Sequence, residues 1–144
     1  MNEPKRFSLV KPTTQTRFRI DFDWWKNHDN NWRIYLLSCL CPEHQTIFAN
    51  ATTDIWIDWI DPETAEVKVL DGLQHTLLVH CARQPSFVTA NTSVVDAVFR
   101  TLLARENQPL TLSEIGQLIN RPPEMLLRTL AGSQVYKGIR PISD

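Results

Sequence analysis

Three cysteines and two histidines are the residues of this sequence best suited to hold a metal ion, and they fall in two clusters. Cys39, Cys41 and His44 lie around the end of one predicted helix, and His80 and Cys81 lie in a later one. Zinc favours four such ligands in a tetrahedron. Neighbouring residues on a helix point about 100° apart, so His80 and Cys81 rarely share one ion, and Cys39 fits a small core position. From this pattern we expect neither a metal site nor a cofactor.

Acidic side chains surround a predicted β-hairpin: Asp54, Asp58, Asp61, Glu63 and Glu66. Paired carboxylates can perform acid–base chemistry or bind magnesium. Hairpin turns are also acidic simply because water solvates them, and no histidine, serine-elbow or glycine-loop motif accompanies this group. We therefore expect no catalytic residues and a non-enzymatic protein, in which the hairpin forms an acidic rim for a basic partner.

Tryptophan is unusually abundant, with five in the chain. Trp56 and Trp59 are three residues apart in a predicted strand, so they point to opposite faces. One of them is then exposed, unless another element covers the second face. Exposed tryptophans in apolar patches often mark interfaces, which makes Trp56 and Trp59 candidates for binding a protein partner.

The composition is that of a globular protein. The chain has 144 residues, of which 42% are hydrophobic and 22% charged, enough for one domain or two small ones. Its apolar runs are far shorter than the roughly 20 residues that span a bilayer, and residues 1–12 lack the apolar core of a secretory signal. With an odd number of cysteines, we expect a reduced, cytoplasmic setting. The oligomeric state is not indicated.

Charge is unevenly distributed although the formal net charge is −1. Residues 1–20 carry five basic groups against Glu3, residues 21–91 carry four basic and ten acidic groups, and residues 92–144 carry six basic and five acidic groups. The chain thus has a basic arm, an acidic middle and a nearly neutral C-terminal part. A DNA-binding protein usually shows a stronger basic patch.

The first two thirds of the chain predict a mixed α+β part over 17–90, preceded by a flexible basic arm over 1–16. Residues 17–22 alternate like a half-buried strand, and Asp23 is expected to cap a short helix. An apolar stripe over 32–40 predicts a helix that Pro42 ends. A hairpin is predicted near 55–70, followed by a helix that Asp71 caps and that runs through Cys81.

The C-terminal part, 91–144, predicts three helices and an extended tail. Apolar residues from Val94 to Leu103 form the face of the first helix. The sequence Thr111-Leu-Ser-Glu114 fits a capping box for the second helix, and proline suits the start of the third. The predicted fold class is α+β: a small helix-plus-hairpin part packed on a three-helix unit.

Residues 93–140 resemble the winged-helix superfamily in their order of helix, capped helix, tight turn, helix and short strand. The segment from Pro109 to Ile115 is similar to the opening of the second helix in such domains, and Gly116 takes the small position that packs against the third helix. The resemblance covers the C-terminal third only. It implies a helix-turn-helix whose third helix would enter the major groove of DNA.

Cations on and near that third helix would serve DNA binding, although its start departs from a DNA-reading pattern. Glu124 opposes phosphate, and the prolines at 122–123 remove two backbone donors. With the basic arm, the candidate nucleic-acid-binding residues are Arg121, Arg128, Lys137, Arg140, Lys11 and Arg17.

Three hypotheses follow for the function. The first is a non-enzymatic binding protein, a nucleic-acid-associated regulator or assembly factor with a winged-helix-like domain. The alternative is an adaptor subunit of a larger complex that contacts only protein. The third is a small metal-dependent enzyme.

Overall fold

The N-terminal strand pairs with the C-terminal end of the chain, and this pairing defines the division of the molecule. A computed structural model describes residues 11–48, 56–60 and 64–142. The chain forms two compact units, which we call unit 1 (residues 1–30 and 88–144) and unit 2 (residues 31–87). This division differs from the predicted boundaries, because residues 17–30 join the C-terminal unit instead of the part that follows them.

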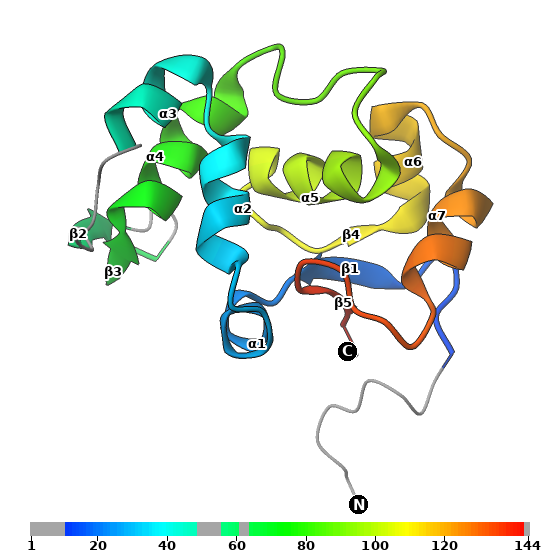
Figure 1. Cartoon of the computed structure of the whole chain (residues 1–144). Coiled ribbons are helices and arrows are strands. Elements are labelled where there is room, and N and C mark those ends of the chain that lie inside the picture. Colours follow the sequence, from blue (N-terminus) through cyan, green and yellow to red (C-terminus); the bar gives the residue numbers. More distant parts are fainter. Residues whose placement is uncertain (1–10, 49–55, 61–63, 143–144) are drawn as a thin grey trace, which may run out of the picture. The chain divides into compact units, whose positions relative to one another are not determined.

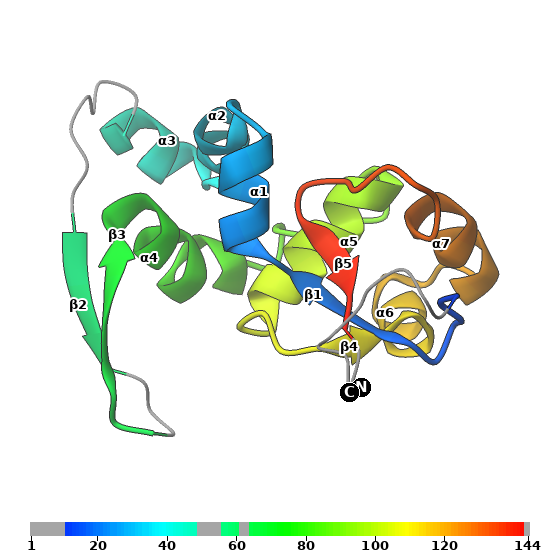
Figure 2. The same ribbon diagram turned by 90° about the horizontal axis from the view of Figure 1, so that it is seen from below.

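Unit 1 contains a three-stranded antiparallel sheet with the order β4-β1-β5. The strands are β1 (Arg17–Ile20), β4 (Leu110–Thr111) and β5 (Ile139–Pro141), and β1 lies in the middle (Figure 2). Phe18 pairs with Leu110 on one side and with Pro141 on the other. The alternation predicted for 17–22 is present, since Phe18 and Ile20 are buried while Arg17 and Arg19 are exposed.

The buried face of β1 packs on α5 (Val94–Ala104). The ring of Trp25, in α1 (Phe22–His28), meets the ring of Phe99 edge-on, with centroids 5.4 Å apart. Asp21, rather than the predicted Asp23, caps α1: its Oδ1 accepts a hydrogen bond of 3.0 Å from the Trp24 amide. Asp21 is favoured because it directly precedes the first helical residue.

Helices α6 (Leu112–Ile119) and α7 (Pro123–Leu130) follow β4 (Figure 1). The predicted capping box is present: the Thr111 hydroxyl accepts from the Glu114 amide at 3.0 Å, and the Glu114 carboxylate accepts from the Thr111 amide at 2.8 Å. The end of the predicted arm is held at this helix start, where the Ser113 amide donates to the Thr14 carbonyl. Residues 1–10 lie outside the described part.

Unit 2 is built from three α-helices, a 3₁₀ helix and a hairpin within its described residues. These elements are α2 (Trp32–Cys39), α3 (Pro42–Phe48), β2 (Trp56–Ile60), β3 (Val67–Asp71), α4 (Gly72–Val79) and η1 (Cys81–Arg83). Strands β2 and β3 pair antiparallel, with Asp58 opposite Val69, in the stretch where a hairpin was predicted. Leu36, Leu73 and Leu77 form buried parts of this unit.

Two helices of unit 2 differ from the prediction. Pro42 does not merely end the preceding helix; it is the first residue of α3, a position that proline favours because its missing amide has no helical partner there. The helix predicted to run through Cys81 stops at Val79, and η1 begins at Cys81. His80, between them, is non-helical with φ −127° and ψ −63°.

The fold is of the α+β class, as predicted. None of the described helices is long and apolar enough to cross a membrane.

Gly116 in α6 allows a close approach of the turn before α7. A Cβ there would lie 2.6 Å from the Arg121 carbonyl oxygen and 3.1 Å from Pro123 Cγ. Alanine normally stabilises a helix interior relative to glycine, but this backbone contact must open to admit it. We expect Gly116→Ala to destabilise the chain by about 1–3 kcal/mol in urea-induced unfolding.

Gly132→Ala is the matched control, because a Cβ at Gly132 would meet nothing within 4 Å. Its free energy of unfolding should stay within about 0.5 kcal/mol of the wild type. Equal effects of the two substitutions would contradict the close packing of Gly116.

Candidate metal centre

Cys41 and His44 are brought to one side of unit 2 by the start of α3. Cys41 immediately precedes Pro42, and its carbonyl accepts the Gln45 amide at 2.9 Å, which is the first helical hydrogen bond. His44 lies in the first turn of α3, three residues after Cys41. The Sγ atom of Cys41 lies 3.2 Å from Nδ1 of His44, so the helix start alone creates a two-ligand pair.

His80 and Cys81 reach the same place from the break between α4 and η1. The His80 amide donates to the Thr76 carbonyl in the last turn of α4, while the His80 carbonyl accepts from Arg83 in η1. The backbone therefore changes direction at His80, and two consecutive side chains turn toward Cys41. Figure 1 shows α3 and α4 side by side in unit 2.

Three of the distances between the four ligand atoms are close to the edges of a tetrahedral zinc site. All of them lie within 4.8 Å of one another. The two sulfurs are 3.5 Å apart, Cys81 Sγ lies 3.6 Å from His44 Nδ1, and Cys41 Sγ lies 3.7 Å from His80 Nδ1. In a tetrahedron, bonds of about 2.3 Å to sulfur and about 2.0 Å to nitrogen place two sulfurs about 3.8 Å apart and a sulfur and a nitrogen about 3.5 Å apart.

The centre is partly shielded from water. Cys81 is 1% exposed, while Cys41, His44 and His80 are half-buried. Burial raises the pKa of the Cys81 thiol to about 11, so without a cation this thiol is neutral and a poor nucleophile. A bound divalent ion reverses this balance, because a coordinating thiol is deprotonated outright. Two thiolates and one Zn²⁺ are together neutral, which suits a buried site.

The convergence of these residues contradicts the geometric argument made from the sequence, which assumed that His80 and Cys81 share one regular helix. The interruption at His80 removes that assumption. Cys39 behaves as predicted, since it is buried on α2 and is not part of the cluster. The Cys41-x-x-His44 spacing was visible in the sequence, whereas the break between α4 and η1 was not.

The predicted nucleic-acid-binding residues do not gather on α7. Arg17 and Arg140 are on the sheet, Arg128 is exposed on α7, and Lys11 is exposed before β1. Two of the six have internal roles. Arg121 donates to the carbonyl of Ala90 at 3.1 Å and to that of Thr92. Arg140 pairs with Asp21 at 3.2 Å.

Lys137 lies in the turn before β5 with φ 52°. Of the proposed protein-binding residues, the backbone of Trp56 and Trp59 is in β2, but their side chains lie outside the described part, as do Asp54, Asp61 and Glu63. Asp58 and Glu66 are exposed.

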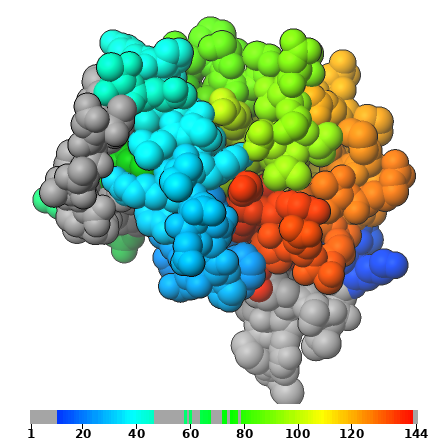
Figure 3. All heavy atoms as spheres, in the orientation of Figure 1, coloured from blue at the N-terminus to red at the C-terminus, as the bar shows by residue number. Residues whose placement is uncertain are grey.

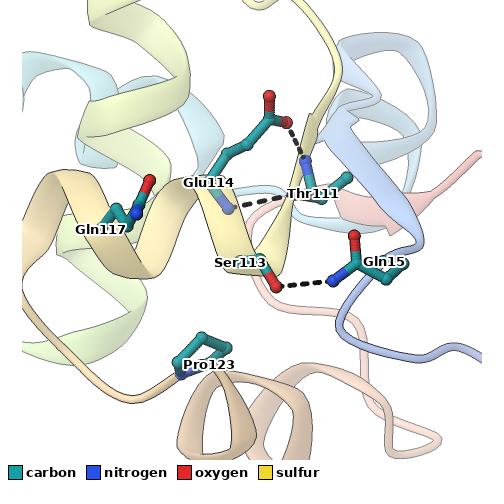
Figure 4. Close-up of a pocket in the computed structure, with 6 residues that line it drawn as sticks. All are labelled: Gln15, Thr111, Ser113, Glu114, Gln117 and Pro123. Carbon is teal, nitrogen blue, oxygen red and sulfur yellow. Dashed lines mark hydrogen bonds between the residues drawn. The ribbon is translucent and has the colours of Figure 1, made fainter.

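A pocket lies at the start of α6 in unit 1 (Figure 4). Its lining residues are Gln15, Thr111, Ser113, Glu114, Gln117 and Pro123. Gln15 Nε2 donates to the Ser113 hydroxyl at 2.9 Å, and Thr111 and Glu114 form the capping box. These polar groups thus stabilise the helix start and the chain segment before β1.

Comparison with models of protein families, with curated protein sequences and with solved structures finds no match to this chain. The winged-helix resemblance therefore stays a prediction.

Substitution of single cysteines can distinguish zinc ligands from cysteines that only pack in the core. Cys41→Ser should lower the apparent zinc affinity by about 100-fold or more, since loss of even an outer-shell partner costs about 10–100-fold. Cys39→Ser is the matched control: it removes a buried thiol two residues away and should retain zinc even if it lowers stability. Competition with a chromophoric chelator measures both. Zinc loss from Cys39→Ser alone would show that the four-residue assignment is incorrect.

Proposed function

We propose that this chain is a non-enzymatic binding protein in which unit 2 is organised by a structural zinc ion. The observation that carries the proposal is the convergence of four ligand atoms, from Cys41, His44, His80 and Cys81, within 4.8 Å of one another. Two thiols and two imidazoles are a common ligand set of structural zinc sites.

The ligand chemistry favours zinc over the hard cations. Magnesium and calcium bind oxygen ligands, whereas thiolate and imidazole select zinc among the common divalent ions that lack redox chemistry. No carboxylate belongs to the cluster within the described residues.

The number of protein ligands favours a structural ion over a catalytic one. Catalytic zinc sites use three protein ligands and keep the fourth position for water or substrate. Here two cysteines and two histidines fill all four positions of the tetrahedron. The hypothesis of a small metal-dependent enzyme is therefore less well supported than a binding role.

The small size of unit 2 explains why a bound ion would stabilise it. The unit spans 57 residues, and cores of domains below about 70–80 residues often need a metal or disulfide for stability. The ligand cysteines are 40 residues apart in the sequence, so one ion closes a long loop that includes the hairpin and α4. Closing long loops removes much conformational freedom from the unfolded chain.

Elemental analysis of natively purified protein should find one zinc ion for each chain. Replacement by Co²⁺ should give the intense visible absorption of tetrahedral cobalt together with thiolate-to-cobalt charge transfer. A pale, octahedral cobalt spectrum, or zinc-free native protein that does not take up added zinc, would overturn the proposal.

Chelation should loosen unit 2 selectively. Because binding free energy of a structural ion is folding free energy, removing zinc should speed amide hydrogen exchange in α3, α4 and η1, while α5 and α6 of unit 1 keep their protection. Hydrogen exchange with mass spectrometry of the full chain measures both units at once. Unchanged exchange in unit 2 after complete zinc removal would argue against a structural role.

His80→Asn and His75→Asn form a matched pair for the same measurement. His80 is in the cluster, whereas His75 is half-buried on α4 and is not. His80→Asn should reproduce the effect of chelation in the presence of zinc, and His75→Asn should not.

A further inference from the structure

The face of the unit 1 sheet opposite its buried side carries three arginines. Residues two apart on a strand lie on the same face, so Arg17 and Arg19 share one face of β1 and both are exposed. Arg19 is directly opposite Arg140 of β5 in the strand register. Thr111 of β4 stands opposite Arg17. We call Arg17, Arg19 and Arg140 the arginine face.

The arginine face belongs to unit 1, the more basic of the two units. Unit 1 contains 12 lysines and arginines against nine aspartates and glutamates, whereas unit 2 contains three against seven. A chain with net charge −1 thus concentrates its positive charge in the unit that carries the sheet.

Contacts with Asp21 and Trp24 hold Arg140, one member of the arginine face, in position. Arg140 pairs with Asp21 at 3.2 Å, and its guanidinium lies 5.1 Å from the centroid of the Trp24 ring. Trp24 in turn stacks on His28, with centroids 4.0 Å apart. Figure 3 shows the segment with β5 (red) and α1 (blue) meeting at the surface. Arg140 is therefore held in place, and Arg17 and Arg19 extend the positive charge along β1.

Like charges directly opposite one another on a sheet are unfavourable. Asp21 lies beside the charge of Arg140, and a bound polyanion would compensate the charge of Arg19. All three cations are arginines, whose planar fork of donors fits phosphate better than the point charge of lysine. Their spacing along a strand and across to the next one suits a chain of charges rather than a single anion.

We propose that the arginine face binds the phosphate backbone of a nucleic acid, independently of base sequence. Exposed arginines contribute by releasing condensed counterions from the backbone. This site differs from the third-helix docking implied by the winged-helix resemblance, because it uses the sheet and includes Arg19. It does not depend on the zinc centre, which belongs to unit 2.

The test uses the full chain with its zinc content verified, and measures binding to a fluorescent mixed-sequence DNA duplex and to one of its strands over a series of salt concentrations. Arg17→Ala/Arg19→Ala should weaken binding of the preferred probe about tenfold or more at low salt and reduce the slope of log K against log salt by about 1.4–1.8, the value for two lost phosphate contacts.

The charge-matched control is Arg105→Ala/Arg128→Ala. These two exposed arginines lie at the end of α5 and on α7, so removing them lowers the net charge equally without touching the sheet. Its affinity should fall less than about threefold. If the first double variant unfolds, Arg19→Gln, which keeps length and polarity, should reduce the slope by about half as much.

Two outcomes would overturn the proposal. They are no binding of either probe by the wild type at low salt, whether or not the chain binds anionic lipid vesicles, and equal losses in the two double variants. The zinc measurements test the metal centre separately. A zinc-free chain that still binds DNA through Arg17 and Arg19 would contradict the proposed metal centre and leave the proposed DNA-binding face intact.

Discussion

Pairing of β1 with strands near the other end of the chain is the constraint on which the architecture depends. Phe18 contacts its partners at Leu110 and Pro141, more than 90 residues further along. This pairing makes residues 31–87 an insertion that is flanked on both sides by residues of unit 1. It also buries Phe18 and Ile20 against α5 and thereby fixes which face of β1 presents Arg17 and Arg19.

Local signals predicted most of the helices but not the pairing of β1. The capping box at Thr111 and Glu114 and the proline at the start of α7 are short-range patterns whose physics lies within one turn of helix, so the sequence reveals them. The alternation of Arg17 to Ile20 correctly predicted a strand with one buried face. Its partners could not be predicted, because strand pairing across the chain leaves no local pattern, and the predicted boundaries therefore differ from the two compact units at residues 17–30.

The metal centre also shows how far local sequence patterns can predict structure, here within a few residues. Cys41-x-x-His44 is a local spacing, and the start of α3 turns it into a pair. His80 and Cys81 are consecutive, which on a regular helix separates their side chains. Apolar residues continue through Leu77, Leu78 and Val79, so periodicity alone extends the helix past the residue where it breaks. A single non-helical residue thus decides whether four potential ligands form a site.

The discontinuous layout of unit 1 has a consequence for synthesis. A ribosome completes unit 2 when residue 87 has emerged, whereas unit 1 lacks β4 and β5 until residues 111 and 141 have been made. During that interval β1 has neither of its partners, and Phe18 and Ile20 have no core to enter. Pairings of such long sequence separation form slowly, and unpaired strands of this kind are the segments of nascent chains most prone to aggregate. During this time the arginines that alternate along β1 place positive charge on an unpaired strand. Such charge disfavours its pairing with strands of other chains until β5 has been made.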